Sequence, residues 1–433
     1  MKDLLPIYES NSEPVFAYEG EDTYLALIKD TSLEEYENYL NKLSATGYTK
    51  HTENEIRGNR FATYYCDEYV INAGFYPYSS ESRLTIEKKR KLLGLESDNV
   101  WVKNDEIITS FAHVGLGEHN QAGLSCVLQL ADGSFIIVDG GYENCAEPLH
   151  NYLKEKSPTE NITVAAWILT HADTDHCRAF VRYMKSYAAD TTVEVLISSF
   201  LTTSNRNEVD VFTAASENGV DMVKAHTGYK LYARNSVVEF LYTIDNLLPG
   251  DIGANASSLC FAIETEGERI LITGDITEGV TTVMNPMYGD YLKSDILQLS
   301  HHGLRNGTGR KMDNTREFYS LVRPEVIFWP VFSKFFINSI GADWINDPEF
   351  GNVAAIAEFY WNREAEKYAR EVYLGGDPIT VLELPYRRYS AYNFVSGQKR
   401  EPVRLDIAYG SDDRLHFEKE CTDTSIDRIS WND

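Results

Sequence analysis

Histidines and aspartates cluster at the ends of apolar runs in this sequence. The run TVAAWILT is followed within six residues by His171, Asp173, Asp175 and His176. Such a short, almost wholly apolar run is typical of a strand buried on both faces. A chain of this kind must therefore fold around buried strands. We expect the four polar residues on the loop between that strand and the next helix, where sites of α/β proteins are commonly built.

Two further apolar runs end in the same way. ILITGD ends at Asp275, and SDILQLS is followed directly by His301 and His302. Carboxylates and neutral imidazoles gathered in one place lose solvation and repel unless a cation compensates them, and a divalent metal does so. The alternative is that Asp173 and Asp175 cap a helix while the histidines bond to backbone. With three motifs in register, we favour a metal site.

Strand pairs with glycine turns surround these motifs. One hairpin is predicted to turn at Asp132-Gly133 and to end at Asp139, and a second to turn near Gly267. A third is predicted around residues 375–378, after a helix near residues 353–370. Two sets of strand pairs separated by helices predict an α/β (α+β) fold in which two packed sheets are flanked by helices.

The first hundred residues follow a different pattern. A strand is followed by a helix that begins with a capping box at Ser32 and Glu35, and then by two or three strands rich in tyrosine. We expect a small α+β domain with a charged connector over residues 1–104. The domain that carries the motifs would span residues 105–385, and a C-terminal extension residues 386–433.

The composition limits the class of protein. With 40 Lys and Arg against 66 Asp and Glu, the net charge is −26, which disfavours bulk binding to nucleic acid. The N-terminus lacks the pattern of a signal peptide, and no run approaches the roughly 20 apolar residues of a membrane span. The six cysteines form no CxxC pair. We expect a soluble cytoplasmic protein with reduced, mostly buried thiols and no membrane partner.

The motifs together carry a resemblance. H-x-D-x-D-H at 171–176, T-G-D at 273–275 and S-H-H-G at 300–303 resemble the metallo-β-lactamase superfamily. The branch they resemble is the hydrolase domain of ComEC-type competence proteins. The resemblance covers roughly residues 107–385. It implies an αββα sandwich, metallo-β-lactamase-like, that binds two divalent metal ions.

The resemblance also implies the metal ligands. They would be His171, Asp173, Asp175, His176, Asp275 and one of His301 and His302. The first two would bind one ion, the next two the second ion, and Asp275 both. We favour His302 over His301 as the remaining ligand of the second ion. Asp139 would be a carboxylate that steadies the ligand loop.

Three features depart from the superfamily pattern. The aspartate at position 173 replaces a histidine, as is common in this branch. The usual third histidine of the first ion is missing between residues 245 and 260, where Asp251 or Asn255 is nearest and His226 lies farther upstream. Arg178 stands where a small residue is usual, and it faces either an anionic substrate or solvent.

The expected chemistry follows from these ligands. Carboxylates in place of histidines make the site harder, which shifts its preference from zinc alone toward manganese or iron. We expect two divalent ions, Zn²⁺ or Mn²⁺. We expect a hydrolase of a small phosphodiester or nucleotide-like substrate, with Asp175, Asp275 and His302 in its catalytic centre. Arg305 and Lys311, in the loop after the third motif, either hold phosphate or are merely solvated.

Two other functions stay open at this stage. One is hydrolysis of a lactone, lactam or thioester at the same centre, since a fold does not decide the substrate. The other is a binding module whose site has decayed, which the missing histidine favours. Extended nucleic acid is disfavoured as a partner by the net charge, and the sequence does not specify an oligomeric state.

Overall fold

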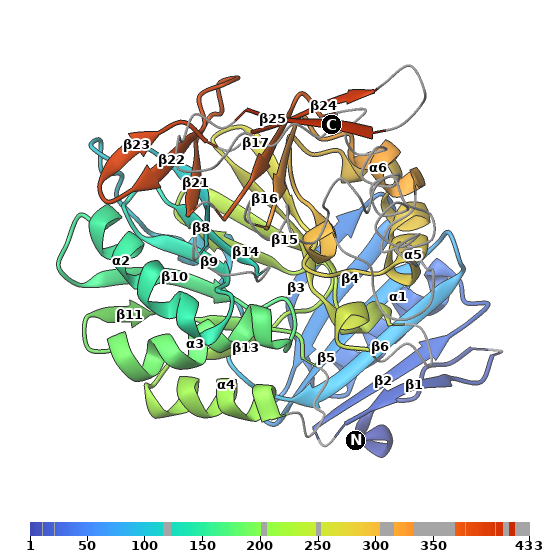
Figure 1. The fold of residues 1–433 in the computed structure, drawn as a ribbon. Helices are drawn as coiled ribbons and strands as arrows, with labels where there is room; N and C mark the ends of the chain where they lie inside the picture. The colour runs from blue at the N-terminus through green and yellow to red at the C-terminus, as the bar shows by residue number, and fades with distance from the viewer. Residues whose placement is uncertain are drawn as a thin grey trace.

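A computed structural model of the chain shows three β-sheets and several surrounding helices (Figure 1). The structure describes residues 1–10, 12–20, 22–115, 123–200, 206–247, 253–303, 316–331, 369–376, 378–402, 404–409 and 415–420.

The N-terminal sheet is antiparallel, with the order β1-β2-β6-β5-β4-β3. Its strands are β1 (Val15–Glu19), β2 (Thr23–Ile28), β3 (Thr49–Ile56), β4 (Asn59–Tyr65), β5 (Tyr69–Tyr76) and β6 (Glu81–Lys88). Helix α1 (Leu33–Ala45) packs on this sheet through Tyr36, Leu40 and Leu43, and the predicted capping box of Ser32 and Glu35 is present. The sequence did not predict β1 and β3.

The second sheet has the order β13-β12-β10-β9-β8-β7-β21-β22-β23, with β11 beside β10. Its strands are β7 (Ser110–Val114), β8 (Ser125–Gln129), β9 (Phe135–Asp139), β10 (Ile162–Ile168), β11 (Thr191–Val193), β12 (Leu196–Ser198), β13 (Met222–Lys224), β21 (Ile379–Glu383), β22 (Tyr392–Val395) and β23 (Gln398–Arg400). Strands β9, β10, β12 and β13 run parallel. Their carboxyl ends therefore lie along one edge of the sheet.

The third sheet has the order β14-β15-β16-β17-β18-β19-β20-β24-β25. Its strands are β14 (Lys230–Ala233), β15 (Ser236–Tyr242), β16 (Cys260–Thr265), β17 (Glu268–Ile272), β18 (Ile296–Gln298), β19 (Val326–Trp329), β20 (Glu371–Leu374), β24 (Arg404–Tyr409) and β25 (Leu415–Glu420). From β17 to β20 the strands are parallel. Both this sheet and the second thus present parallel strand ends.

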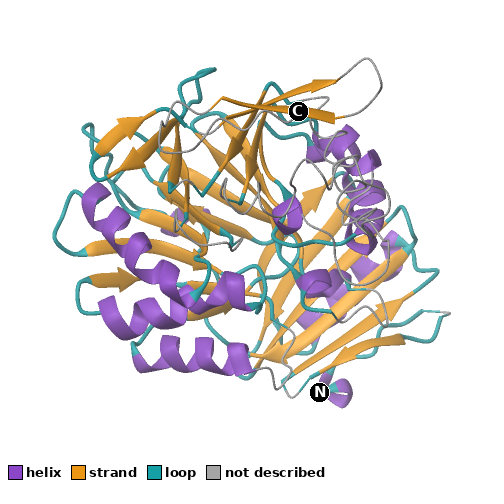
Figure 2. Ribbon diagram, viewed as in Figure 1, coloured by secondary structure: helices purple, strands orange, loops and turns teal. Residues whose placement is uncertain are grey.

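Helices cover the outer faces of the two larger sheets. The α-helices are α2 (Ala146–Lys156), α3 (Thr174–Tyr187), α4 (Arg206–Glu217), α5 (Glu278–Tyr288) and α6 (Arg316–Val322). The 3₁₀ turns are η1 (Lys2–Leu4), η2 (Glu96–Asp98), η3 (Glu143–Cys145), η4 (Ile244–Asn246), η5 (Asn255–Ser257), η6 (Gly289–Leu292) and η7 (Ser300–Gly303). Figure 2 shows α2, α3 and α4 gathered on one side of the molecule and α5 and α6 on the other.

The main core lies between the second and third sheets. Ile136 and Ile168 of one sheet pack in the same cluster as Phe261, Ile270 and Phe328 of the other. A second cluster fills the space between the second sheet and α2 and α3, and a third lies on the outer face of the third sheet. The predicted sandwich of two sheets flanked by helices is therefore confirmed.

The N-terminal sheet packs on the outer face of the third sheet, where Phe61 and Tyr76 join the same cluster as Leu241 and Met287. A buried charged network also joins the two parts. His226 lies between Glu87 of β6, 2.9 Å from its Nε2, and Asp245, 3.0 Å from its Nδ1. Lys224 pairs with the same Glu87 at 3.0 Å. Both ring nitrogens of His226 are thus engaged by carboxylates at this interface.

Three sequence expectations about elements need comment. The strands predicted as a hairpin around residues 375–378 do not pair, because β20 belongs to the third sheet and β21 to the second. The helix expected near residues 353–370 lies outside the described residues, apart from its last two positions, which are not helical. Strands β22 to β25 extend the two larger sheets beyond residue 385. The proposed domain boundaries stay predictions.

Among the described residues, no helix is long and apolar enough to cross a membrane. Five of the six cysteines are described, and all five are free thiols, with Cys126, Cys145, Cys177 and Cys260 buried. Reduced, mostly buried thiols were expected, and these five agree with that expectation.

Candidate metal centre

The first motif begins on a loop and ends on a helix. His171 follows β10, Asp173 is the N-cap residue of α3, and Asp175 and His176 lie in the first turn of that helix. The expectation that all four lie on the loop was therefore wrong for the last two. The helix α3 begins at Thr174, before the expected start after His176, and Asp173 has the extended backbone typical of an N-cap residue. Its side chain, however, makes no capping hydrogen bond. Helix capping therefore does not account for an aspartate at position 173.

Asp139, at the end of β9, anchors the motif from below. It is fully buried, and its backbone is left-handed, with φ +58°. Its carboxylate accepts hydrogen bonds from the backbone N–H and the hydroxyl of Thr170, both at 2.7 Å. It also accepts one from Nδ1 of His176 at 2.8 Å. Asp139 holds a ring proton on Nδ1, so Nε2 of His176 is the nitrogen that faces the site, as in metal-ligating histidines.

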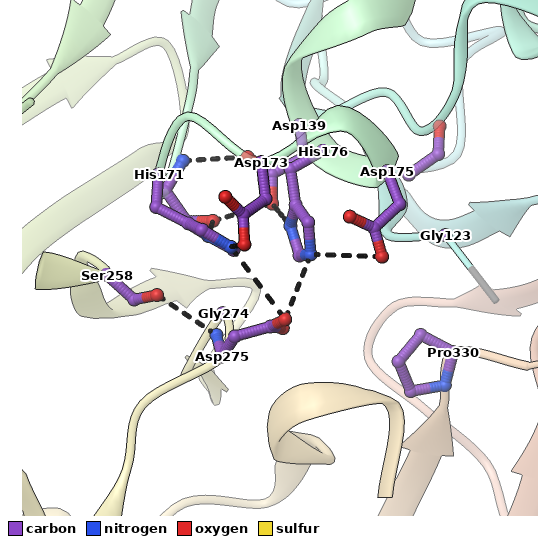
Figure 3. A network of polar contacts seen from close by, with 12 residues as sticks. Gly123, Asp139, His171, Asp173, Asp175, His176, Ser258, Gly274, Asp275 and Pro330 are labelled. Atoms are coloured by element: carbon purple, nitrogen blue, oxygen red, sulfur yellow. Dashed lines mark hydrogen bonds and ion pairs between the residues drawn. The ribbon is translucent and has the colours of Figure 1, made fainter. Parts of the chain in front are cut away.

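Three strand ends bring the ligand candidates together. Nε2 of His176 lies 3.2 Å from Oδ2 of Asp275 and 3.2 Å from Nε2 of His302. Oδ2 of Asp275 is also 3.8 Å from Nε2 of His171, and Nε2 of His302 is 3.3 Å from Oδ2 of Asp175. Figure 3 shows His171, His176 and Asp275 turned toward one another. Side chains separated by more than a hundred residues thus meet at one point.

Two trios have the spacing of metal ligands. The candidate ligand atoms of His171, His176 and Asp275 all lie within 4.8 Å of one another, and so do those of Asp175, His176 and His302. Asp173 lies beside the first trio, with Oδ2 3.6 Å from Nε2 of His171. Its side chain is 43% exposed, and that of Asp175 is 26% exposed. These two carboxylates therefore face the solvent side of an otherwise buried cluster.

The histidine pair adopts an unusual backbone. His301 and His302 are both left-handed, with φ +48° and +53°. Such conformations are costly for residues other than glycine, and they often occur at functional sites. His302 is buried, and its Nδ1 lies 3.2 Å from the carbonyl of Pro330, which leaves Nε2 toward the cluster. His301 lies at the edge, with Nε2 3.9 Å from Oδ2 of Asp275 and 3.4 Å from Nδ2 of Asn255.

Two buried polar atoms test whether a metal fits this cluster. In the described part of the chain, Nε2 of His171 and Oδ1 of Asp275 have no hydrogen-bond partner. An unpaired buried acceptor costs about 1–3 kcal/mol, so each needs a partner that the described residues do not supply. Imidazole nitrogen and carboxylate oxygen are both ligands of zinc and manganese. The residues therefore fit one or two divalent ions.

The electrostatics also favour a cation. Burial opposes charge on Asp275 and His176, but their mutual attraction outweighs it: the pKa of Asp275 is held well below its usual range and that of His176 well above. Burial likewise opposes ionisation of Asp175, yet a hydrogen bond to His302 and nearby imidazoles lower its pKa to about 2. The carboxylates thus stay ionised and need positive charge. A divalent ion supplies it directly.

The remaining predicted residues lie in different places. The guanidinium of Arg178 pairs with Asp210 of α4 at 2.6 Å. Both ring nitrogens of His226 are engaged by carboxylates beside the N-terminal sheet, so its place as a missing ligand is not supported. Arg305, Lys311 and Asp251 lie outside the described residues. The assignment of individual ligands and substrate contacts stays a prediction.

Two residues that hold the site were not singled out from the sequence. Thr170 joins His171 to Asp139, since its hydroxyl contacts both the carboxylate and Nδ1 of His171. Gln298, fully buried, accepts hydrogen bonds at 2.8 Å from the backbone N–H groups of Thr273 and Gly274, which precede Asp275. The signal for Gln298 was present, because an amide inside the apolar run SDILQLS needs buried partners.

Comparisons with known proteins add two curated relatives. No family model matches the chain. ComE operon protein 3 of Bacillus subtilis is 31% identical over 147 residues, which are 34% of this chain and 18% of that protein. An RNase J-like protein of Methanocaldococcus jannaschii is 24% identical over 188 residues, 42% of this chain and 40% of that protein. The chain therefore spans less than half the length of the curated relatives it matches.

Among solved structures, the metallo-beta-lactamase fold protein YhfI from Bacillus subtilis is similar, with 15% identity and a TM-score of 0.39. The match covers 64% of this chain and 99% of that protein.

Proposed function

We propose that this chain, whose two-sheet sandwich and cluster of histidines and aspartates resemble the metallo-β-lactamase superfamily, is a metal-dependent hydrolase of small phosphodiesters or nucleotide-like substrates. The resemblance to the ComEC-like branch agrees with the match to ComE operon protein 3. The substrate class is our inference from the ligand chemistry.

One observation carries the proposal. Nε2 of His171 and Oδ1 of Asp275 are buried, point into the cluster and have no partner among the described residues. They lie beside Nε2 of His176, whose tautomer Asp139 sets. Protein interiors seldom keep such atoms without a ligand. We infer that this cluster is built to hold divalent ions, with Asp275 between the two trios.

The chemistry depends on the ions and on the chain together. The divalent ions that the two trios would hold would supply a hydroxide nucleophile at neutral pH and neutralise charge on substrate oxygens. Asp275, whose backbone N–H donates to the hydroxyl of Ser258 at 3.2 Å, would orient the attacking water. Asp173 and Asp175, the more exposed carboxylates, mark the side from which substrate approaches.

The carboxylate content supports a phosphodiester substrate. Three of the six candidate ligands in the cluster are carboxylates, those of Asp173, Asp175 and Asp275. Oxygen ligands suit the harder ions that serve phosphoryl chemistry. The net charge of −26 favours a small substrate over a long polyanion. In this proposal Arg305 and Lys311 hold the phosphate oxygens.

A substrate panel tests the proposal. Bis-p-nitrophenyl phosphate, a chromogenic lactam and a chromogenic thioester are each assayed with Zn²⁺ and with Mn²⁺. We expect cleavage of the phosphodiester, and we expect Asp275→Asn to lower it by about 100-fold or more, as losing a group that acts in the transition state does. A preference for the lactam or thioester would refute the substrate class. If metal-loaded protein turned over none of these substrates, the proposal that the chain is a hydrolase would be refuted.

A further inference from the structure

A second pocket lies away from the metal cluster, where the last strands of both large sheets meet. It encloses about 500 Å³ and is lined by residues of β20, β22 and β23, by the segment before β22, and by the start of β24. Its lining includes Tyr373, Tyr389, Tyr392, Arg400 and Arg404. None of the candidate metal ligands lines it. A volume of this size is within the range of small-molecule sites.

The charge of this region is opposite to that of the chain. Residues 386–404 contain five cations, Arg387, Arg388, Lys399, Arg400 and Arg404, and a single acid, Glu401. The whole chain has a net charge of −26. Three of these cations, Lys399, Arg400 and Arg404, line the pocket together with Glu401. Their excess over the one acid creates a local positive potential, which attracts anions.

The cations are held on aromatic rings. The guanidinium carbons of Arg388 and Arg404 lie 4.7 and 4.9 Å from the ring centroid of Tyr389, and Nζ of Lys399 lies 4.2 Å from that of Tyr392. Contacts of this kind are cation–π interactions, and they orient the charged groups. The backbone N–H of Tyr389 donates to the carboxylate of buried Glu371 at 2.9 Å, which fixes the position of Tyr389. The pocket is therefore ordered before any ligand arrives.

Two of these cations differ in how far they are neutralised. Lys399 pairs with Glu383 at 2.5 Å. Arg400 is exposed at the rim and forms no ion pair with any described residue. An anion that enters the pocket therefore meets a guanidinium, that of Arg400, whose charge no described acidic side chain neutralises. Guanidinium groups bind phosphate through paired hydrogen bonds.

We propose that this pocket binds a nucleotide, with its phosphate on Arg400 and Arg404 and its base against Tyr389. Tyrosine is 55% exposed at position 389, so part of its ring remains open to stack with a base. The combination of cations and tyrosines selects an aromatic phosphate over phosphate alone. The inference does not depend on catalysis at the metal cluster.

Calorimetric titration of the whole protein with AMP, in EDTA to keep the metal cluster from binding it, tests the proposal. Losing a charged hydrogen bond costs about 1.5 kcal/mol or more, so Arg400→Ala with Arg404→Ala should raise the Kd by about tenfold or more. A matched control, Lys50→Ala with Lys103→Ala, removes two exposed cations elsewhere and should leave the Kd unchanged. The single exposed change Arg400→Glu serves if the double variant does not fold.

Further titrations test the role of the aromatic ring. Tyr389→Ala should raise the Kd for AMP by about fivefold or more, because the base loses the ring on which it stacks. The Kd for inorganic phosphate should rise less, because phosphate loses only the support that the ring gives to Arg404. A deoxythymidine decamer that binds more tightly than AMP would identify a strand as the source of the nucleotide. No binding of AMP, an unchanged Kd in Arg400→Glu, or inorganic phosphate binding as tightly as AMP would overturn the proposal.

Discussion

Replacing Asp139 by asparagine tests how the metal cluster is organised. The change preserves size, and asparagine tolerates the left-handed backbone at this position. The carboxylate accepts hydrogen bonds from two groups of Thr170 and from Nδ1 of His176. An amide offers one acceptor oxygen and one NH₂. In either orientation its NH₂ group therefore meets a donor.

The magnitude follows from these contacts. Hydrogen bonds to a charged group are worth about 1.5–3 kcal/mol each, so losing at least one at this fully buried position should cost about 1.5–3 kcal/mol or more of unfolding free energy. If NH₂ faces His176, Nδ1 must accept and the ring proton moves to Nε2. That nitrogen then has no lone pair for a metal. Loss of such a partner typically weakens metal binding by about 10–100-fold.

Two measurements separate these effects. Urea denaturation in EDTA gives the stability of the metal-free protein, and competition with a chromophoric chelator gives the affinity for Zn²⁺ and Mn²⁺. Asp132→Asn is the matched control, because it makes the same change at the turn before β9, where the carboxylate bonds to Ser134 and Arg234. We expect its metal affinity to stay at the wild-type value. Wild-type affinity and stability in Asp139→Asn would refute this account of the site.

Three other perturbations give distinct outcomes. His302→Ala should lose more bound metal by elemental analysis than His301→Ala, because His302 is the one directed into the cluster; the reverse order would exchange their roles. Burial opposes charge on His226, yet two carboxylates raise its pKa from 6.5 to about 9. The unfolding free energy of wild type should exceed that of His226→Gln by a constant amount below pH 6.5, and this difference should fall as the pH rises through about 9. A difference that does not depend on pH in urea titrations would contradict the raised pKa. Gly274→Ala should destabilise the fold and weaken metal binding, because a Cβ there would lie 2.9 Å from Thr170 at φ +52°; an unchanged melting temperature would argue against that contact.

The sequence predicted those parts of the fold that depend on local pattern. Apolar runs and glycine turns located β8, β9, β16 and β17, and the motifs at their ends located the metal cluster. Strand β3, TKHTENEI, was missed because most of its side chains are polar and exposed or half-buried. A short connection between β20 and β21 looks the same in sequence whether the strands pair or enter different sheets.

Non-local contacts were beyond the reach of sequence patterns. His226 was a candidate ligand only because a lone histidine has no visible partner in a sequence. Its partner Glu87 is 139 residues away, on β6 of the N-terminal sheet. Likewise, the sequence could not choose between His301 and His302, since adjacent residues differ only through the backbone that orients them. Their left-handed conformations send one ring into the cluster and leave the other at its edge.

The most direct test of the account is the metal content of the chain. Protein purified without chelator is analysed for zinc and manganese, beside the double variant His176→Ala with Asp275→Ala, which removes the histidine common to both trios and the carboxylate of the first. The account predicts near-stoichiometric divalent metal in the wild type and none in the folded double variant. Metal retained by that variant at the wild-type level would contradict it.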